Sequence, residues 1–199
     1  MKYLFATFLI MFSACSAIAG FDGHSAVEVL HAGGHGSGVY IGRNYVLTAG
    51  HVAEGFATVT VTHPGTSGFW VDSWEANVVW VDKVRDFALL RIKAVSLPDT
   101  MPAAVLACKM PELNAPIDIV GWPLNLGRLT THGYVASDDA VRGPWQHSFV
   151  AVAPITFGNS GGPAYDADGK LMGLVVGIVD GTSLSLIAPV APICDELPK

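Results

Sequence analysis

Short runs in which apolar and polar residues alternate recur along this chain, with turn-forming residues between them. The segment "ATVTVT" at residues 57–62 has a clean period of two, which is typical of a strand with one buried face. The same reasoning predicts six short strands in the first half of the chain, bounded by turn residues such as Gly, Asn and Asp. These strands are expected at Ser25–His31, Gly38–Ile41, Tyr45–Thr48, Ala57–Thr62, Ala76–Val81 and Phe87–Ile92.

A connecting segment with four prolines follows at residues 93–116 and has no apolar period. Beyond it the pattern predicts a second set of strands, one of them very short. These are expected at Ile117–Gly121, Leu129–Ala136, Ser148–Ala153, Pro163–Tyr165, Leu171–Gly177 and Leu184–Ala188. The tail can form one helical turn from Pro192, because proline is tolerated at the first helical position.

Two sets of about six strands in 199 residues predict an all-β protein. A closed barrel hides the edges of its strands. We therefore expect two packed six-stranded antiparallel β-barrels and a short C-terminal helix. The N-terminal barrel is expected at residues 20–108 and the C-terminal barrel at residues 109–199. The composition agrees, since 22 Gly, 12 Pro and only 14% charged residues are typical of many short strands joined by turns.

The charge distribution argues against a nucleic-acid partner. The formal net charge is −6, and no run of Lys and Arg exceeds two residues. A face that binds phosphates needs clustered positive charge. We expect no nucleic acid among the partners.

The first residues have the layout of a secretory signal. Lys2 precedes an apolar run, and small residues lead to Ala17-Ile18-Ala19, an A-x-A cleavage site. We expect a signal peptide at residues 1–19 and a periplasmic or secreted protein. The alternatives are lipidation at Cys15 and a retained anchor, and only these two would bring the protein to a membrane.

Export changes the interpretation of the cysteines. Loss of Cys15 leaves Cys108 and Cys194, which form either a disulfide in an oxidising compartment or two separate buried thiols. No spacing of Cys and His resembles a zinc site, so we expect no metal and no other cofactor. His31 and His35 of "HAGGH" are expected in a Gly-rich turn, solvated.

Three short motifs carry candidate chemistry. They are "VLTAGHV" with His51, "RDFALLRI" with Asp86, and "FGNSGGP" with Ser160. A serine hydroxyl needs a base to take its proton, and the base needs a partner that fixes its tautomer. Histidine is suited to the first task because its pKa lies near neutral pH. Each candidate is expected at the start or end of a strand, where side chains can converge on a cleft.

In this order, the motifs resemble those of the trypsin-like (chymotrypsin-fold) serine peptidases. The similarity is strongest to the bacterial HtrA-type and glutamyl-endopeptidase-type members and extends over "GSGVYIGRNYVLTAGHV", "IVGWPLNLG" and "GNSGGPAYDADGKLMGLVVGI". The resemblance implies that His51, Asp86 and Ser160 are the catalytic residues. Asp82 and Asp72 compete with Asp86, but only Asp86 directly precedes an apolar strand as in the family. The PDZ domain typical of HtrA proteins is not expected here.

The resemblance also implies roles for the residues around the serine. The backbone N–H groups of Gly158 and Ser160 would form the oxyanion hole, which binds the charge that develops on the substrate carbonyl. Asn159 stands where zymogen-activated members have an aspartate that pairs with a new N-terminal ammonium. An amide cannot form that ion pair, so no propeptide cleavage is expected to build the site. Some members tie the inter-barrel linker to the C-terminal segment by a disulfide, which favours a Cys108–Cys194 bond.

The residues expected to line the primary specificity pocket lie before the serine and on the later strands. They are Pro154, Ile155, Thr156, Val176, Gly177 and Ile178. None is acidic, which argues against a preference for Lys or Arg. Thr156 and Ser185 keep a glutamate pocket open, but small or aliphatic side chains are favoured.

The sequence therefore favours an exported serine endopeptidase that acts on protein or peptide substrates. An alternative from another class is a trypsin-fold binding or regulatory protein with little turnover, since one fold hosts many functions. A third reading, an unrelated β-sandwich adhesin, would make all three motifs accidental. The oligomeric state has no signature in the sequence.

Overall fold

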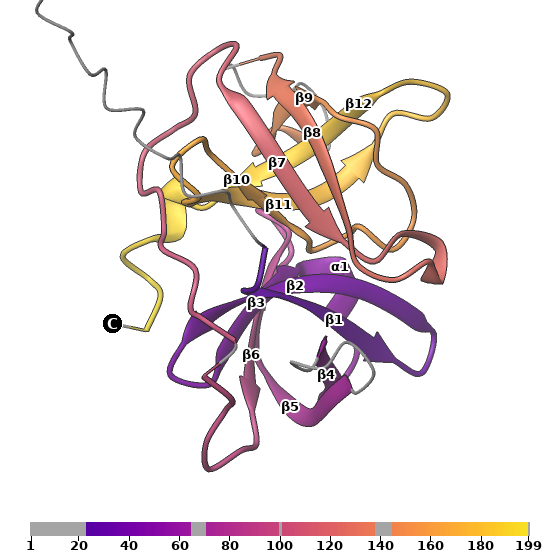
Figure 1. The fold of residues 1–199 in the computed structure, drawn as a ribbon, viewed down its shortest axis with the longest axis vertical. Helices are drawn as coiled ribbons and strands as arrows, with labels where there is room; N and C mark the ends of the chain where they lie inside the picture. The colour runs from indigo at the N-terminus through magenta and orange to yellow at the C-terminus, as the bar shows by residue number, and fades with distance from the viewer. Residues whose placement is uncertain (1–22, 65–70, 100, 138–144, 199) are drawn as a thin grey trace, which may run out of the picture.

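Two closed β-barrels make up the protein (Figure 1). The computed structural model describes residues 23–64, 71–99, 101–137 and 145–198. Neighbouring strands follow the order β1-β2-β3-β6-β5-β4 in the first barrel and β10-β11-β12-β9-β8-β7 in the second, and all these pairs are antiparallel. The all-β fold with two six-stranded antiparallel barrels is confirmed.

The strands of the first barrel follow the predicted ones closely. They are β1 (Ala26–His31), β2 (Gly34–Gly42), β3 (Tyr45–Ala49), β4 (Thr58–Pro64), β5 (Val71–Asp82) and β6 (Phe87–Ile92). On β4 the valines Val59 and Val61 are buried while Thr58 is exposed, so the period of two separates a core face from an outer face in the first half of this strand. The strands β2 and β5 are longer than expected. Their backbone pairing, β2 with β1 and β5 with β4, continues beyond the segments that the sequence pattern predicted.

The second barrel contains β7 (Pro116–Gly121), β8 (Leu129–Val135), β9 (Phe149–Val152), β10 (Pro163–Tyr165), β11 (Leu171–Ile178) and β12 (Leu184–Pro189). Three short helical turns complete the described elements. They are α1 (Gly50–Ala53), η1 (Pro123–Asn125) and η3 (Ala191–Ile193). The predicted C-terminal helix is a 3-10 turn that begins at Ala191, with Pro192 in its first turn.

The apolar core of the first barrel continues into the interface between the barrels. Residues of the second barrel, among them Tyr165, Leu174 and Ile193, belong to the same buried cluster as the valines and leucines of the first. A smaller cluster fills the interior of the second barrel. The two barrels are therefore joined by a buried, mainly apolar surface, on which Ser25 Oγ and Tyr165 Oη also form a buried hydrogen bond of 2.6 Å.

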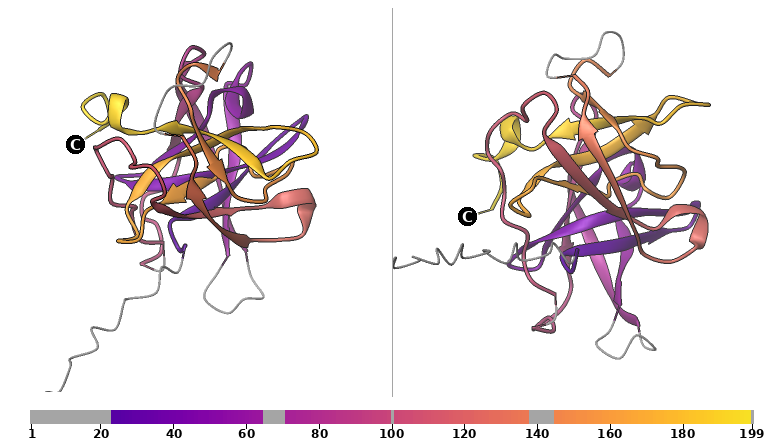
Figure 2. Two further views of the ribbon diagram at one scale, coloured as in Figure 1. Left: turned by 90° about the horizontal axis from the view of Figure 1, so that it is seen from above. Right: turned by 45° about the horizontal axis from the view of Figure 1, so that its top comes forward.

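The linker between β6 and β7 is attached to the second barrel before β7 begins. Leu106 forms a parallel bridge with Leu171. Cys108 is joined by a disulfide to Cys194, just after η3, with a Cα–Cα distance of 5.8 Å. The views in Figure 2 show the C-terminal turn beside this linker. The domain limits at residues 108 and 109 stay a prediction.

The signal-peptide prediction at residues 1–19, with Cys15, lies outside the described residues. Within the ranges that the structure describes, the helices are too short to cross a bilayer.

Removal of the disulfide is expected to lower stability. The bond closes a loop with a sequence separation of 86, and a long loop restricts the unfolded chain strongly. A Cys108→Ser/Cys194→Ser double variant should lose about 2–4 kcal/mol of unfolding free energy, measured by urea denaturation. A reductant should lower the wild-type midpoint and leave that of the double variant unchanged. Coinciding midpoints for the two oxidised proteins would contradict this expectation.

Candidate active site

His51 lies in α1, directly after the end of β3. This turn lies close to Asp86, the residue before β6. The N–H of Gly50 donates to the carbonyl of Asp86 at 2.9 Å. A Cβ atom at Gly50 would lie 2.9 Å from Asp86 Oδ1, so a larger residue would push the two segments apart. Glycine at this position brings the backbone of His51 within reach of Asp86.

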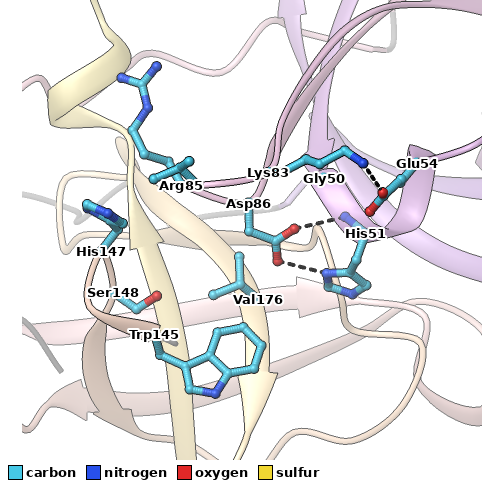
Figure 3. Close-up of a pocket in the computed structure, with 11 residues that line it drawn as sticks. Gly50, His51, Glu54, Lys83, Arg85, Asp86, Trp145, His147, Ser148 and Val176 are labelled. Atoms are coloured by element: carbon cyan, nitrogen blue, oxygen red, sulfur yellow. Dashed lines mark hydrogen bonds and ion pairs between the residues drawn. The ribbon is translucent and has the colours of Figure 1, made fainter. Parts of the chain in front are cut away.

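The carboxylate of Asp86 accepts two hydrogen bonds from His51 (Figure 3). Oδ1 accepts from the backbone N–H at 2.8 Å, and Oδ2 lies 2.7 Å from ring atom Nδ1. A carboxylate at Nδ1 favours the tautomer in which Nδ1 carries the proton, which leaves Nε2 free to accept one. Asp86 has a φ of 59°, a left-handed conformation that is uncommon for residues other than glycine.

The other two candidate aspartates lie elsewhere. Asp72 pairs with His63 in the register of β4 and β5. Asp82 accepts hydrogen bonds from the N–H groups of Val84 and Arg85, and its carboxylate also pairs with Arg85 Nε. Of the three, Asp86 is the one that contacts His51.

Arg85 connects the turn before Asp86 to the C-terminal segment. Its Nη1 and Nη2 donate to the two carboxylate oxygens of Glu196 at 2.7 and 2.8 Å, and in Figure 3 the side chain points away from His51. Hydrogen bonding to Glu196, followed by that to Asp82, raises the pKa of Arg85. The hydrogen bond from Arg85 also holds the pKa of Glu196 below its usual value. Burial raises the pKa of Asp82, but the hydrogen bonds from Arg85 and Val84 and the charge of Arg85 together outweigh it and leave this pKa lowered.

Ser160 lies in a tight turn between β9 and β10. Gly158 has a φ of 96°, and a Cβ atom there would lie 2.3 Å from the carbonyl oxygen of Trp122, so this position requires glycine. Across the interface, the N–H of Ser37 donates to the carbonyl of Ser160 at 2.7 Å. Among the described residues, no backbone carbonyl accepts from the N–H of Gly158 or of Ser160. Both groups therefore stay candidate donors for the predicted oxyanion hole.

One open cavity of about 680 Å³ brings His51, Gly158 and Ser160 together. Thr156, Val176, Gly177 and Ile178, all predicted to line a specificity pocket, contribute to its wall.

The other two predicted pocket residues are not part of this cavity. Ile155 packs against the core cluster of the second barrel, and Pro154 is exposed. For this pair the pocket assignment stays a prediction, since the segment before the serine turns toward the barrel interior at Ile155.

A second cavity of about 310 Å³ is lined by both His51 and Asp86. Figure 3 shows Trp145, His147 and Val176 around it. Trp145 lines both cavities and lies close to Gly177, where a Cβ atom would be 3.3 Å from the indole ring. Nothing in the local sequence pattern identified Trp145 or His147, because they precede a strand in a segment without apolar period.

The prediction of solvated loop histidines is wrong for His35. This residue lies on β2, is partly buried, and its Nε2 lies 2.9 Å from the Trp122 carbonyl. His31 and His35 both line the larger cavity. Burial, and next the nearby His35, lower the pKa of His31. The pairing of β1 with β2 continues to the tip of the hairpin, where His31 lies opposite Gly34 and His35 lies opposite Leu30. Both histidines therefore belong to strands rather than to a loop.

No group of three or more His, Cys, Asp and Glu side chains within the described ranges is placed to hold a metal ion. His51, which is paired with Asp86, lines the same cavity as Ser160 and Gly158. Such groups can transfer a proton and stabilise an oxyanion.

The chain belongs to the trypsin-like peptidases. A model of the trypsin-like peptidase domain matches residues 36–174, which is more than half of the chain.

Its relatives include the serine endoprotease DegS of Escherichia coli, 30% identical over 157 residues that cover 77% of this chain and 41% of the relative. A probable periplasmic serine endoprotease, DegP-like, of Brucella suis is 32% identical over 70% of this chain and 26% of its own length. The chain thus spans less than half the length of these relatives.

Solved structures share the fold. The serine endoprotease from Yersinia pestis superposes with a TM-score of 0.71 at 26% identity, over 87% of this chain and 61% of that one. The inactive form of the Rv3671c protease gives a TM-score of 0.70 at 24% identity, over 87% of each chain. The resemblance to HtrA-type peptidases is therefore confirmed.

The ion pair of Arg85 with Glu196 predicts a pH-dependent stability. Because the pKa of Glu196 is lowered in the folded state, its contribution is present above the ordinary glutamate pKa of about 4.3 and is lost as the pH falls through the folded value. A Glu196→Gln variant should have a lower urea midpoint than the wild type at pH 7, and the difference should disappear well below pH 4.

The matched control is Glu112→Gln. Glu112 is exposed, and the structure shows no ion pair for it among the described residues. This variant should follow the wild type at both pH values. A midpoint difference for Glu196→Gln that is the same at pH 7 and in acid would contradict the assignment.

Proposed function

We propose that the protein is a serine endopeptidase in which Ser160 is the nucleophile, His51 the general base and acid, and Asp86 the residue that orients His51. The single observation that carries the proposal is the double hydrogen bond between His51 and Asp86 at the wall of a cavity that Ser160 and Gly158 share. Membership of the trypsin-like peptidase family supports the same assignment.

The proposed reaction uses these groups in the following order. Ser160 Oγ attacks the peptide carbonyl carbon while His51 Nε2 takes the hydroxyl proton. The N–H groups of Gly158 and Ser160 donate to the resulting oxyanion, and the protonated His51 is stabilised by Asp86. His51 then gives its proton to the leaving amine, and the peptide C–N bond breaks. A water molecule, deprotonated by His51, hydrolyses the acyl-enzyme and returns Ser160 to its free state.

The site is proposed to need no new N-terminus. Asn159 is buried, with 3% of its surface exposed, and its Nδ2 donates to the carbonyl of Thr156 at 3.1 Å. This hydrogen bond stays within the turn that carries Ser160. The turn is thus supported by an internal amide where zymogen-activated members use an aspartate and an ammonium.

We further propose that the enzyme prefers small or aliphatic side chains on the acyl side of the cleaved bond. Val176 and Ile178 supply apolar wall, and Gly177 leaves room between them. Ser185 does not offer a free polar contact, because it is fully buried and donates to the Ala153 carbonyl at 2.7 Å. Asp180 also lines the cavity but is exposed in the turn after β11, where solvent screens its charge.

Export to an oxidising compartment is part of the proposal. The sequence of residues 1–19 supports it, and so does the disulfide, since such bonds persist outside the cytoplasm. The Brucella relative is described as probably periplasmic.

Fluorophosphonate labelling tests the nucleophile. A folded wild-type protein should carry one adduct, on Ser160, and heat-denatured protein none, as seen by intact mass and peptide mapping. Ser160→Ala should abolish the adduct and peptide hydrolysis, and His51→Ala should slow both by about 10³-fold or more. A folded wild type without an adduct would contradict the proposed function and favour a binding or regulatory protein of the same fold.

The specificity proposal is tested with peptides that differ only at the residue before the cleaved bond. kcat/KM should be highest for Val, Ala and similar residues and lower for Glu and Lys. One methylene in an apolar pocket changes the barrier by only about 1–3 kcal/mol, so differences among aliphatic residues should be about 10–200-fold or less. A clear preference for Lys would show that Asp180, rather than the apolar wall, decides the choice.

A further inference from the structure

Ser37 has no assigned role, yet it lies at the centre of the contacts between the barrels. It is on β2 and none of its surface is exposed. Its backbone N–H donates to the Ser160 carbonyl at 2.7 Å. Its hydroxyl donates to the Gly158 carbonyl at 2.7 Å and accepts from the N–H of Trp122 at 3.0 Å. One residue of the first barrel thus holds three backbone groups of the second.

The two peptide units that meet at Gly158 are both anchored. The carbonyl of Phe157 accepts from the N–H of Leu124 at 2.9 Å. Because a trans peptide is planar, the N–H of Gly158 must point away from Leu124. The carbonyl of Gly158, in the next unit, is held by the Ser37 hydroxyl. Together these two hydrogen bonds set the direction of the Gly158 N–H, which is one of the proposed oxyanion donors.

The first of these anchors also depends on Ser37. Trp122, two residues before Leu124, has its N–H bound to Ser37 Oγ and its carbonyl bound to His35 Nε2 at 2.9 Å. Leu124 itself has a φ of 52°, a conformation that a leucine adopts only under constraint from its surroundings. The contacts of β2 with Trp122 provide such a constraint.

We propose that Ser37 is a positioning residue, whose buried hydroxyl fixes the peptide units around Gly158 and so aims the oxyanion-hole donor. This inference rests on the proposed function. Without the hydroxyl, the Gly158 carbonyl and the Trp122 N–H would both be buried without that partner. Rotation of the peptide units at Gly158 would relieve this, because glycine has few steric barriers, and it would turn the N–H out of the hole.

The test compares Ser37→Ala with Ser25→Ala. Ser25 is the matched control, because its buried hydroxyl also bridges the barrels, to Tyr165, and does not contact the site. Fluorophosphonate labelling of Ser160 in the wild type comes first. It is followed by kcat and KM on a fluorogenic peptide, and by the affinity for a peptide aldehyde, whose tetrahedral adduct places an oxyanion in the hole.

For Ser37→Ala we expect kcat to fall at least tenfold, toward the 10²–10³-fold loss typical of a missing donor, with KM changed less than about twofold. Aldehyde affinity should weaken in parallel with kcat. Ser25→Ala should lower the urea midpoint but keep kcat within about twofold. Ser37→Cys nearly preserves the volume and has a weak S–H donor, so its kcat should lie between those of the wild type and Ser37→Ala. If Ser37→Ala does not fold, Ser37→Cys is compared with the wild type instead.

Three outcomes would overturn the inference. They are a Ser37→Ala enzyme with wild-type kcat, an effect on KM alone, and a loss of kcat no larger than that of Ser25→Ala. Each would leave the proposed function intact as long as wild-type Ser160 is labelled. A wild type that is folded and unlabelled would overturn the proposed function, and with it this role for Ser37.

Discussion

The hydrogen bond from the Ser37 N–H to the Ser160 carbonyl joins the two barrels where their functional turns meet. His51 and Asp86 belong to the first barrel and Ser160 to the second, so their mutual position depends on how the barrels pack. A continuous apolar cluster across the interface excludes water and makes such polar links between the barrels strong and directional. The geometry of the candidate site therefore depends on the contacts between the barrels.

Three residues with left-handed backbone conformations lie near the candidate site. Asp86 and Leu124 have left-handed conformations that non-glycine residues rarely adopt, and Gly158 has one that requires glycine. Each lies beside hydrogen bonds from another part of the chain: Gly50 to Asp86, Leu124 to Phe157, and Ser37 to Gly158. Strain of this kind persists only where the surroundings over-determine the conformation, and it is common at functional sites.

Much of the fold and the core of the site could be predicted because they depend on local patterns. Strand positions followed from the period of two, as on β4. His51 and Asp86 lie next to strand ends as expected, whereas Ser160 lies in the turn before β10. Features that depend on distant partners were missed. The Arg85–Glu196 pair joins residues 111 positions apart, and His35 gained its partner from Trp122, 87 positions away. The packing of Ile155 against the core of the second barrel was likewise not visible in the local pattern.

The order of residues was enough to define the all-β class, the strand spacing and the glycine-rich turn around Ser160, since these follow from side-chain period and backbone freedom. Tertiary structure decided which aspartate contacts His51, which residues line the cavity, and what holds Gly158 in place. Those outcomes depend on contacts between segments that are remote in sequence. Closing two barrels and packing them together sets such distances, and no local pattern encodes them.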